Sequence, residues 1–211
     1  MIEYIFSHYD KILTCLTEHV YITFMAVLIA FVIAVPFGIL ISKWKKLSPI
    51  VNGICNAIFS IPTLALLAIL VPITGLGNTS AITALVLYNQ YVLIKNIAEG
   101  FDEINPSIYE IGKGLGYGKL SFFLSVEFPM ALPMIISGIK LAVIGTVTMA
   151  TLGATIGAGG LGELILMGLT MKHWDEVITG AILCAAFAFL LSILLQKVED
   201  AARRRAQGER R

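Results

Sequence analysis

Long apolar stretches alternate with short polar connections along almost the whole chain. A helix needs about 20 residues to cross the hydrocarbon layer of a bilayer, and its backbone hydrogen bonds must be satisfied within the segment. Five stretches approach this length with few charges, so the pattern predicts five membrane-spanning helices. They cover residues 20–41, 50–73, 80–97, 130–152 and 177–197. The predicted fold class is therefore an all-α integral membrane protein.

The first 18 residues follow a different pattern, in which apolar residues recur at roughly helical spacing between polar ones. The apolar positions are Ile2, Ile5, Phe6, Tyr9, Leu13 and Leu16. A helix with one apolar face and a polar opposite face lies on the membrane surface. The expected organisation is an N-terminal amphipathic helix at 1–18, a transmembrane domain at 19–198 and a basic cytoplasmic tail at 199–211.

A sixth span is conceivable at residues 153–171, which contain six glycines and Glu163. Charge decides between the two topologies, because short loops rich in Lys and Arg stay on the cytoplasmic side. Five spans with the N-terminus outside leave only Lys11 and Lys172 on the outer side, whereas a sixth span would place Arg203 and its neighbours there. We therefore expect five spans, a cytoplasmic C-terminus, and an outer-side loop at 153–171 that can dip part-way into the membrane.

Polar residues inside the predicted spans are costly unless they face protein or water. The second span carries four that recur every three or four residues and so share one helical face: Asn52, Asn56, Ser60 and Thr63. Pro62 lacks an amide proton and bends the helix beside them. This polar strip fits a translocation path or a seam with a second chain, and hydrogen bonding between helices explains it equally well. In the fourth span, Lys140 either reaches the inner surface or faces a wet interior.

Composition excludes a soluble enzyme. Hydrophobic residues make up 57% of the chain and charged residues 14%, against about a quarter charged in ordinary domains. The mean hydropathy is +0.86, and a net charge of +1 gives no basic excess for nucleic acid. Cys15, Cys55 and Cys184 are isolated and lack metal-ligand spacing. Neither a metal site nor a catalytic residue is therefore predicted.

Two short motifs resemble nucleotide sites without the context that such sites need. Residues 157–162 fit G-x-G-x-x-G, but their flanks are membrane-helical, whereas a dinucleotide site lies in a βαβ unit. Close backbone packing or a flexible outer gate explains these glycines instead. Gly118 and Lys119 resemble the end of a phosphate-binding loop, but Leu120 replaces the Ser or Thr that this loop requires. The chain is therefore not expected to hydrolyse ATP.

The longest hydrophilic connection, residues 98–127, contains the signals of a short helix. Asn105 suits an N-cap, and Pro106 suits the first helical position. The helix is expected over 106–115, with Gly116 ending it in a left-handed conformation, and helical pattern resumes at Lys119. A short helix held away from the membrane suits docking to a cytoplasmic partner, and a solvated connection without a partner is the alternative.

The same loop carries a family resemblance. Glu110-Ile111-Gly112, then Gly116, then Val126-Glu127-Phe128-Pro129 resembles the EAA motif of ABC-importer permeases, with Ile and Gly in place of two alanines and Phe128 in place of a leucine. Three further segments strengthen the resemblance: Ser60-Ile61-Pro62-Thr63, Ile139-Lys140, and residues 150–162. Over about residues 18–200 the chain resembles the permease subunit of glycine betaine/carnitine/choline (osmoprotectant) ABC importers. That family has the five-span, type I (MetI-like) importer fold.

The resemblance implies a division of labour. Two permeases, either identical copies or paralogues, form the path in the cell membrane, an ATPase dimer docks on the cytoplasmic face, and a substrate-binding protein delivers cargo outside. The helix at 106–115 would be the coupling helix, and the motif gives it these site residues: Pro106, Ser107, Glu110, Gly112, Gly116 and Pro129. Glu110 would pair with a basic group of the ATPase, Gly112 would permit close approach to it, and Gly116 would turn the chain sharply. ATP and Mg²⁺ would bind the partner ATPase, and this chain would bind no cofactor.

Two other functions stay open at this point. A methionine-type importer permease shares the five-span plan, and a channel or scaffold subunit would need no ATPase. Quaternary ammonium ligands favour aromatic cages, so Phe59, Tyr88 and Tyr91 either line the path or simply pack. The exact cargo, the pairing of the permeases and any osmotic regulation are not set by the sequence.

Overall fold

The computed structural model describes residues 2–206, and the described chain is helical throughout apart from short connections, with no strand. Its helices follow one another as α1 (Ile2–Ser7), α2 (Tyr9–Lys43), α3 (Ser48–Phe59), α4 (Thr63–Thr74), α5 (Asn78–Asp102), α6 (Pro106–Gly114), α7 (Lys119–Phe122), α8 (Phe128–Ala150), α9 (Leu161–Met171) and α10 (Trp174–Ala206). A π-helical turn (Phe123–Glu127) joins α7 to α8, and a 3₁₀ turn (Thr151–Ile156) follows α8. The predicted all-α class is confirmed.

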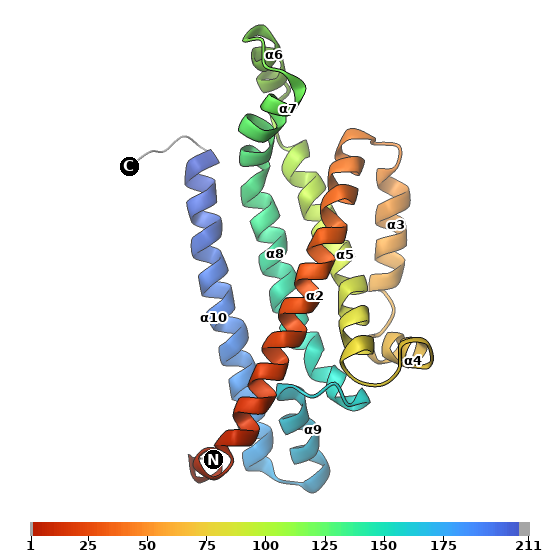
Figure 1. Ribbon diagram of the computed structural model, residues 1–211, viewed down its shortest axis with the longest axis vertical. Coiled ribbons are helices and arrows are strands. Elements are labelled where there is room, and N and C mark those ends of the chain that lie inside the picture. Colours follow the sequence, from red (N-terminus) through yellow and green to blue (C-terminus); the bar gives the residue numbers. More distant parts are fainter. Residues whose placement is uncertain (1, 207–211) are drawn as a thin grey trace.

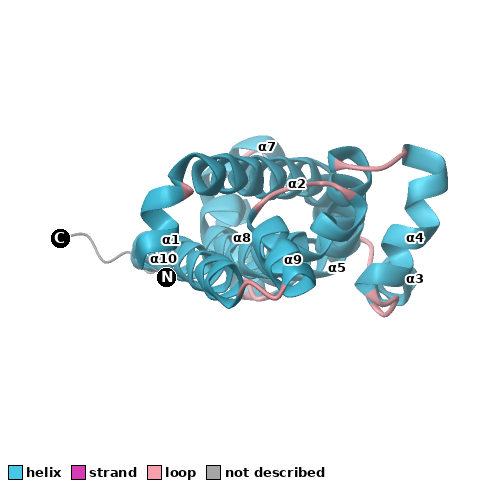
Figure 2. Cartoon of the chain, turned by 90° about the horizontal axis from the view of Figure 1, so that it is seen from below, coloured by secondary structure: helices cyan, strands magenta, loops and turns pink. Residues whose placement is uncertain are grey.

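The helices form one elongated bundle (Figure 1). Helix α5 lies at its centre, against α2 on one side and α8 on the other, while α10 packs on α8 and α9. Helices α3 and α4 lie at the edge of the bundle farthest from α10, and α9 lies at the end where the chain begins (Figure 1 and Figure 2). Helix α6 stands beyond the opposite end.

Three stretches of the described chain are long and apolar enough to cross a membrane: α2, the segment Lys119–Ile156 that contains α8, and α10. The α3–α4 pair makes a fourth if it is counted as one broken span, because the two helices meet at 94°. Pro62 lies in the break, as its predicted bend requires. Helix α5 is 25 residues long and runs beside these spans, but Asn89, Gln90 and Lys95 make it more polar. Five spans therefore stays a prediction.

The sequence-based prediction of one surface helix over residues 1–18 was wrong in its extent. Only Ile2–Ser7 forms a separate helix, and α2 begins at Tyr9 and continues unbroken for 35 residues. The face of this segment that packs on protein is a different one, since Ile12 and Cys15 are buried against Leu161 and Leu164 of α9. The predicted apolar positions Ile5, Phe6, Tyr9 and Leu13 are exposed, so the apolar face itself stays open to lipid.

The predicted boundary of the basic tail also shifts. Residues 199–206 belong to α10, which ends at Ala206, and only residues 207–211 of the predicted tail lie outside the described chain, as does residue 1.

Small residues on α2 allow the close contact with α5. Ala26, Ala30 and Ala34 recur every fourth residue and are fully buried, and Gly38 continues the series. A Cβ atom on Gly38 would lie 2.6 Å from Cγ2 of Ile97 on α5. Stripes of small residues let helix backbones approach closely inside membranes, so this stripe fixes how α2 and α5 pack.

Buried amides connect α5 to both of its neighbours. Gln90 Nε2 donates to the carbonyl of Ala30 on α2 over 3.2 Å, and Asn89 Nδ2 donates to Thr146 Oγ1 on α8 over 2.8 Å. Polar groups that lack water are stabilised only by such partners. Asn89 and Gln90, which lower the hydropathy of α5, therefore connect this helix to α8 and α2.

The glycine-rich segment at 157–162 is a packing element. Gly160 N donates to Glu18 Oε2 over 2.8 Å, and Gly159 and Gly160 have φ of 73° and 78°. A Cβ on Gly160 would lie 2.9 Å from Nδ1 of the buried His19. Helix α9 that follows has 11 residues, too few to cross a bilayer. Of the two explanations left open, close backbone packing holds, and residues 153–171 do not form a sixth span.

Lys140 adopts an arrangement that neither sequence alternative described. Its Nζ donates to Glu199 Oε2 over 2.6 Å and to Gln196 Oε1 over 2.7 Å, both on α10. The Lys140 and Glu199 side chains are 16% and 5% exposed. Lys140 is thus part of a buried ion pair between α8 and α10.

Gly162→Ala is expected to lower the melting temperature of the purified chain by several degrees, which corresponds to about 1–3 kcal/mol of overpacking. Its Cβ would lie 2.6 Å from Thr151 Cα, a backbone atom that cannot rotate away. Gly53→Ala is the matched control, because nothing lies within 4 Å of a Cβ there. Thermal unfolding in detergent measures both variants, and equal melting temperatures would contradict the contact.

Lys140→Met is expected to destabilise the fold by about 3 kcal/mol, because it leaves Glu199 buried with only Arg203 as an ion-pair partner. Adding Glu199→Gln should recover much of the loss. Lys95→Met is the control, since the Lys95–Glu99 pair is exposed and 3.9 Å apart, and such pairs contribute about 0–1 kcal/mol. Unfolding by denaturant titration distinguishes the variants, and similar losses for both lysines would refute this role of Lys140.

Candidate functional site

Helix α6 starts as the sequence predicts. Asn105 is the N-cap, and its side-chain Oδ1 accepts a hydrogen bond from Ser107 N over 2.9 Å. Pro106 occupies the first helical turn, where its missing amide proton costs nothing. Pro106 and Ser107 are both exposed. The cap gives α6 a defined start beyond the end of the bundle (Figure 1).

The end of α6 forms a Schellman motif. Tyr117 N donates to Gly112 O and Gly116 N donates to Lys113 O, each over 3.1 Å. Gly116 has φ of 76°, the left-handed conformation that glycine adopts without penalty. The predicted role of Gly116 as the residue that ends α6 is confirmed in its geometry. Both ends of this short helix are thus fixed by local hydrogen bonds.

Gly112 is in close contact with another part of the same chain. It is buried, and a Cβ there would collide with the ring of Phe122 on α7. The Tyr109 and Tyr117 rings lie 5.5 and 6.1 Å from the same ring, centroid to centroid. The sequence suggested that Gly112 allows a partner to approach, but this face of α6 is already covered by α7. Gly112 therefore fixes the position of α6 on the bundle.

Much of the remaining surface of α6 is open. Glu110 is exposed, as are two large apolar neighbours, Ile111 at 58% and Leu115 at 70%. Leu120 on α7 is 71% exposed. Large apolar side chains that gather on a projecting element are typical of a protein interaction site. We call these four residues the tip surface.

A basic hollow of about 250 Å³ lies behind α6. Lysines line it from three elements, together with Glu127: Lys43, Lys113 and Lys119. The Lys43 ammonium lies 5.1 Å from the centroid of the Phe123 ring. Burial raises the pKa of Tyr109, which also lines the hollow, and the nearby carboxylates of Glu127 and Asp102 raise it further. The surroundings of α6 are thus basic on the side that faces the bundle.

Pro129 lies away from the tip surface, near the start of α8. The π-helical turn Phe123–Glu127 directly precedes α8, and Phe128 N donates to Phe123 O across it. The Phe101 and Phe123 rings stack with centroids 5.8 Å apart, which links this turn to α5. The motif residue Pro129 therefore belongs to the connection behind α6, and the π turn was not predicted from the sequence.

The polar strip of the second span is divided by the bend. Asn52, Asn56 and Ser60 lie along α3 and its end, whereas Thr63 begins α4 beyond the 94° break. The prediction that all four share one face was wrong, because helical periodicity does not continue through the Pro62 bend. Asn52 Nδ2 donates to Ser48 Oγ over 3.0 Å, and Ser60 Oγ donates to Asn56 O over 2.8 Å. These hydrogen bonds stay within the α3 segment, and Asn56 and Ser60 face outward.

Aromatic rings gather beside the bend. Phe59 and Tyr91 stack with centroids 4.9 Å apart, and Phe59 meets Tyr88 edge to face at 6.0 Å. The Tyr88 hydroxyl donates to the carbonyl of Ile61, which the break leaves without a helical partner. The structure thus brings together the three aromatic residues that the sequence analysis singled out.

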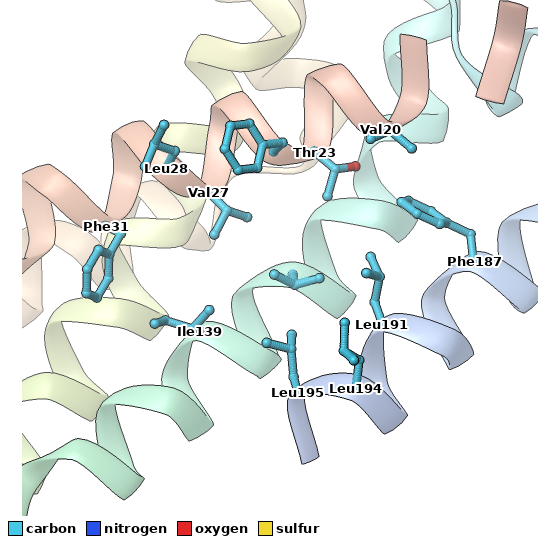
Figure 3. A pocket seen from close by; sticks show the side chains of 12 residues that line it. Val20, Thr23, Val27, Leu28, Phe31, Ile139, Phe187, Leu191, Leu194 and Leu195 are labelled. Carbon is cyan, nitrogen blue, oxygen red and sulfur yellow. The ribbon is translucent and has the colours of Figure 1, made fainter. Parts of the chain in front are cut away.

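A groove of about 410 Å³ lies on another side of the bundle, between α2, α8 and α10 (Figure 3). Aliphatic and phenyl side chains such as Phe31, Ile139 and Leu195 line it, and Thr23 is its one polar residue. This lining suits the hydrocarbon chains of the bilayer, so the groove is not a path for a polar solute.

One cluster in the described chain has the spacing of a metal site. Ligand atoms of Cys15, Glu18 and Glu163 lie within 4.8 Å of one another, although the sequence predicted no metal site. Glu18 already accepts from the amide of Gly160, and both carboxylates lie at the start of α9, where the helix dipole favours negative charge. Helix capping therefore accounts for the cluster.

Comparisons with known proteins agree on one family. Residues 26–207 match the family described as "Binding-protein-dependent transport system inner membrane component". The chain is 35% identical to the glycine betaine/carnitine/choline transport system permease protein OpuCB of Bacillus subtilis, over 86% of this chain and 84% of that protein. It is 32% identical to the osmoprotectant import permease protein OsmW of Salmonella typhimurium, over 94% of each.

Solved structures support the same fold. An inward-facing structure of the MetNI methionine ABC transporter matches with a TM-score of 0.80 at 21% identity, over 93% of this chain and 98% of that one. An amino acid ABC transporter matches with a TM-score of 0.70 at 19% identity, over 95% and 96%. These matches confirm the predicted type I, MetI-like permease fold. With the family match extending over most of its length, the chain belongs to the binding-protein-dependent transport system inner membrane components, the permease subunits of ABC importers.

Proposed function

We propose that this permease imports quaternary-amine compatible solutes such as glycine betaine, carnitine and choline. The support comes from relatives at 32–35% identity, whose names specify these solutes or osmoprotectants in general. The methionine transporter structures are 21–23% identical to this chain and support only the fold. The osmoprotectant function is therefore favoured over the methionine alternative.

As a permease subunit, the chain is not an enzyme, and ATP is hydrolysed by a partner ATPase. In our proposal ATP and Mg²⁺ bind that partner and this chain binds no cofactor. A substrate-binding protein supplies the cargo, as the description of the family implies. A channel or scaffold subunit without an ATPase has no comparable support.

The observation that carries the coupling proposal is the tip surface. Helix α6 is fixed at both ends by local hydrogen bonds, stands beyond the bundle, and exposes Glu110, Ile111 and Leu115. A rigid, projecting helix with exposed apolar residues suits a cleft in the ATPase. Glu110 would pair with a basic group there, while Pro106, Ser107 and Gly116 shape the helix that enters.

Contacts within the chain can transmit a movement of α6 to the membrane-spanning helices. Gly112 and Phe122 lock α6 to α7, and the stacked Phe101 and Phe123 rings join the following turn to α5. Closure of the ATPase pair would therefore displace α5 and α8 with α6. ATP bound to the ATPase would then shift the equilibrium between two arrangements of the bundle. Alternating access requires such a two-state equilibrium.

The orientation in the cell membrane follows from where charges lie. Lys43, Lys45 and Lys46 lie near the α6 end of the bundle, as do the arginines that end α10, while Lys11 and Lys172 lie near the opposite end (Figure 1). Because positive residues stay inside, we place α6 and the C-terminus in the cytoplasm and the N-terminus outside. The outward-facing Asn56 and Ser60 then belong to the seam or path shared with a second permease, either an identical copy or a paralogue.

Gly116→Val is expected to reduce uptake at least about tenfold, because a β-branched residue in the left-handed conformation costs about 1–2 kcal/mol and distorts the end of α6. Gly116→Asn is the matched control, since asparagine tolerates this conformation. Co-purification of the ATPase and uptake in proteoliposomes measure the effect. If Gly116→Val retained both, the coupling proposal would fail.

The cargo itself is tested with the complete system. Proteoliposomes that contain this permease, its ATPase and its binding protein should accumulate radiolabelled choline or glycine betaine when ATP is enclosed, and methionine should not be taken up. ATP-dependent uptake of methionine alone would instead favour the methionine-type importer. Uptake without ATP would favour a channel.

A further inference from the structure

A hollow of about 260 Å³ opens beside the bend of the α3–α4 span. Side chains from α3, α5 and α8 line it: Phe59, Tyr88, Asn89, Leu141, Gly145 and Met149, with Val92. Leu141 is 50% exposed and Phe59 37%, so the hollow faces outward from this chain. It lies on the same part of the bundle as the outward-facing Asn56 and Ser60, close to the seam assigned above.

The walls of the hollow are held rigidly. The Tyr88 hydroxyl is bound to the carbonyl of Ile61, and the Asn89 amide donates to Thr146 over 2.8 Å. The ring of Phe59 is fixed between the two tyrosines, edge to face against Tyr88 and stacked on Tyr91. These rings therefore need little reorganisation to receive a ligand, which favours binding.

The chemistry of the lining selects for a weakly hydrated cation. Aromatic faces attract ammonium groups, and quaternary ammonium ligands are bound by clusters of such rings. Phe59 is the lining ring that is open to such a group, since it is 37% exposed. Tyr91, which stacks on Phe59 from outside the lining, has Lys95 Nζ 6.0 Å from its ring centroid. The residues that line the hollow carry no charge, so a bound cation would not be trapped by a carboxylate. Conduction requires binding strong enough for entry and weak enough for release.

The size of the hollow also fits. Pockets for drug-sized molecules range from about 300 to 1,000 Å³. The hollow, at about 260 Å³, is smaller than these, which suits a smaller ligand such as choline or glycine betaine. Gly145 leaves it open, because nothing lies within 4 Å of where its Cβ would be. By contrast, a Cβ on Gly138, two turns earlier on α8, would lie 2.6 Å from Asn96 Cβ. The glycine at position 145 thus keeps the hollow open, whereas the glycine at position 138 allows close helix packing.

From these observations we infer that the hollow is a transit site for the quaternary ammonium group of the cargo, with Phe59 and Tyr88 as its aromatic walls and Gly145 as its floor. This inference rests on the proposed function and adds a place in the membrane where the cargo is recognised after its release from the binding protein. The Tyr88 hydroxyl and the Asn89 amide are engaged by Ile61 and Thr146, so the hollow, like the groove between α2, α8 and α10 (Figure 3), is lined by apolar atoms, and its cluster of aromatic rings sets it apart.

The first test fills the hollow. In proteoliposomes containing the permease, ATPase and binding protein, Gly145→Val should lower the uptake of choline and glycine betaine at least about tenfold. Gly145→Ala should have a smaller effect. ATPase assembly and ATP hydrolysis stimulated by the loaded binding protein should persist. Ala186→Val is the control, since Ala186 is exposed on α10, and α10 lies at the edge of the bundle farthest from α3 (Figure 1).

The second test changes the ring and keeps the hollow. Phe59→Leu should lower uptake about tenfold through loss of the aromatic face, whereas Phe59→Tyr should retain it. This pair keeps the inference testable if Gly145→Val does not assemble with the ATPase.

The outcomes separate the inference from the function on which it rests. Wild-type uptake by Gly145→Val, equal losses for Gly145→Val and Ala186→Val, or equal uptake by Phe59→Leu and Phe59→Tyr would each overturn the transit site. Such results would indicate that the cargo does not pass through the hollow. If the wild-type complex hydrolysed ATP in response to its binding protein but imported neither solute, the proposed cargo would fail first and the transit site with it.

Discussion

The close contact between α2 and α5 is the constraint on which the rest of the bundle depends. Apolar side chains gain little from leaving lipid for protein, so packing and hydrogen bonds hold membrane helices together. The small residues Ala26, Ala30 and Ala34 bring the two backbones near enough for Gln90 to reach the carbonyl of Ala30. Helix α5 then presents Asn89 to α8, and α8 in turn carries α10. A bulky residue on that stripe would separate α2 from α5 and remove the hydrogen bond with it.

Helix α6 combines two opposite requirements. It must be rigid enough to transmit movement, and it must expose apolar residues that no part of the described bundle covers. Local hydrogen bonds at both ends meet the first requirement without using the outer face. Phe122 adds to this rigidity, because its ring covers Gly112 on the inner face of α6. The outer face is thereby left free, and the aromatic contacts behind it lead to the same helix, α5, that organises the bundle.

Sequence reasoning found the elements whose signals are local. The Asn105 cap, the Gly116 stop and the Pro62 bend are each set by a few neighbouring residues, and their geometry is as predicted. It was less successful where the outcome depends on tertiary contacts. Residues 1–18 were assigned to a separate surface helix because nothing local reveals that α9 covers Ile12 and Cys15 and that α2 begins at Tyr9. The role of Gly112 was assigned to a partner because the approach of Phe122 depends on how the chain folds back. A signal for the α2 stripe was present in the four-residue spacing of alanines, but it was overlooked.

The Lys140–Glu199 pair bears on how the protein responds to ionic strength. Salt screens charges that are exposed to water, and buried pairs are screened much less. The contact of α8 with α10 is therefore insulated from changes in salt concentration, since both side chains are largely covered. The Lys45–Asp102 pair, which joins the end of α2 to the end of α5, is 62% and 40% exposed. As salt rises, the bundle should thus loosen first where α5 leads into α6, while the attachment of α10 stays unchanged.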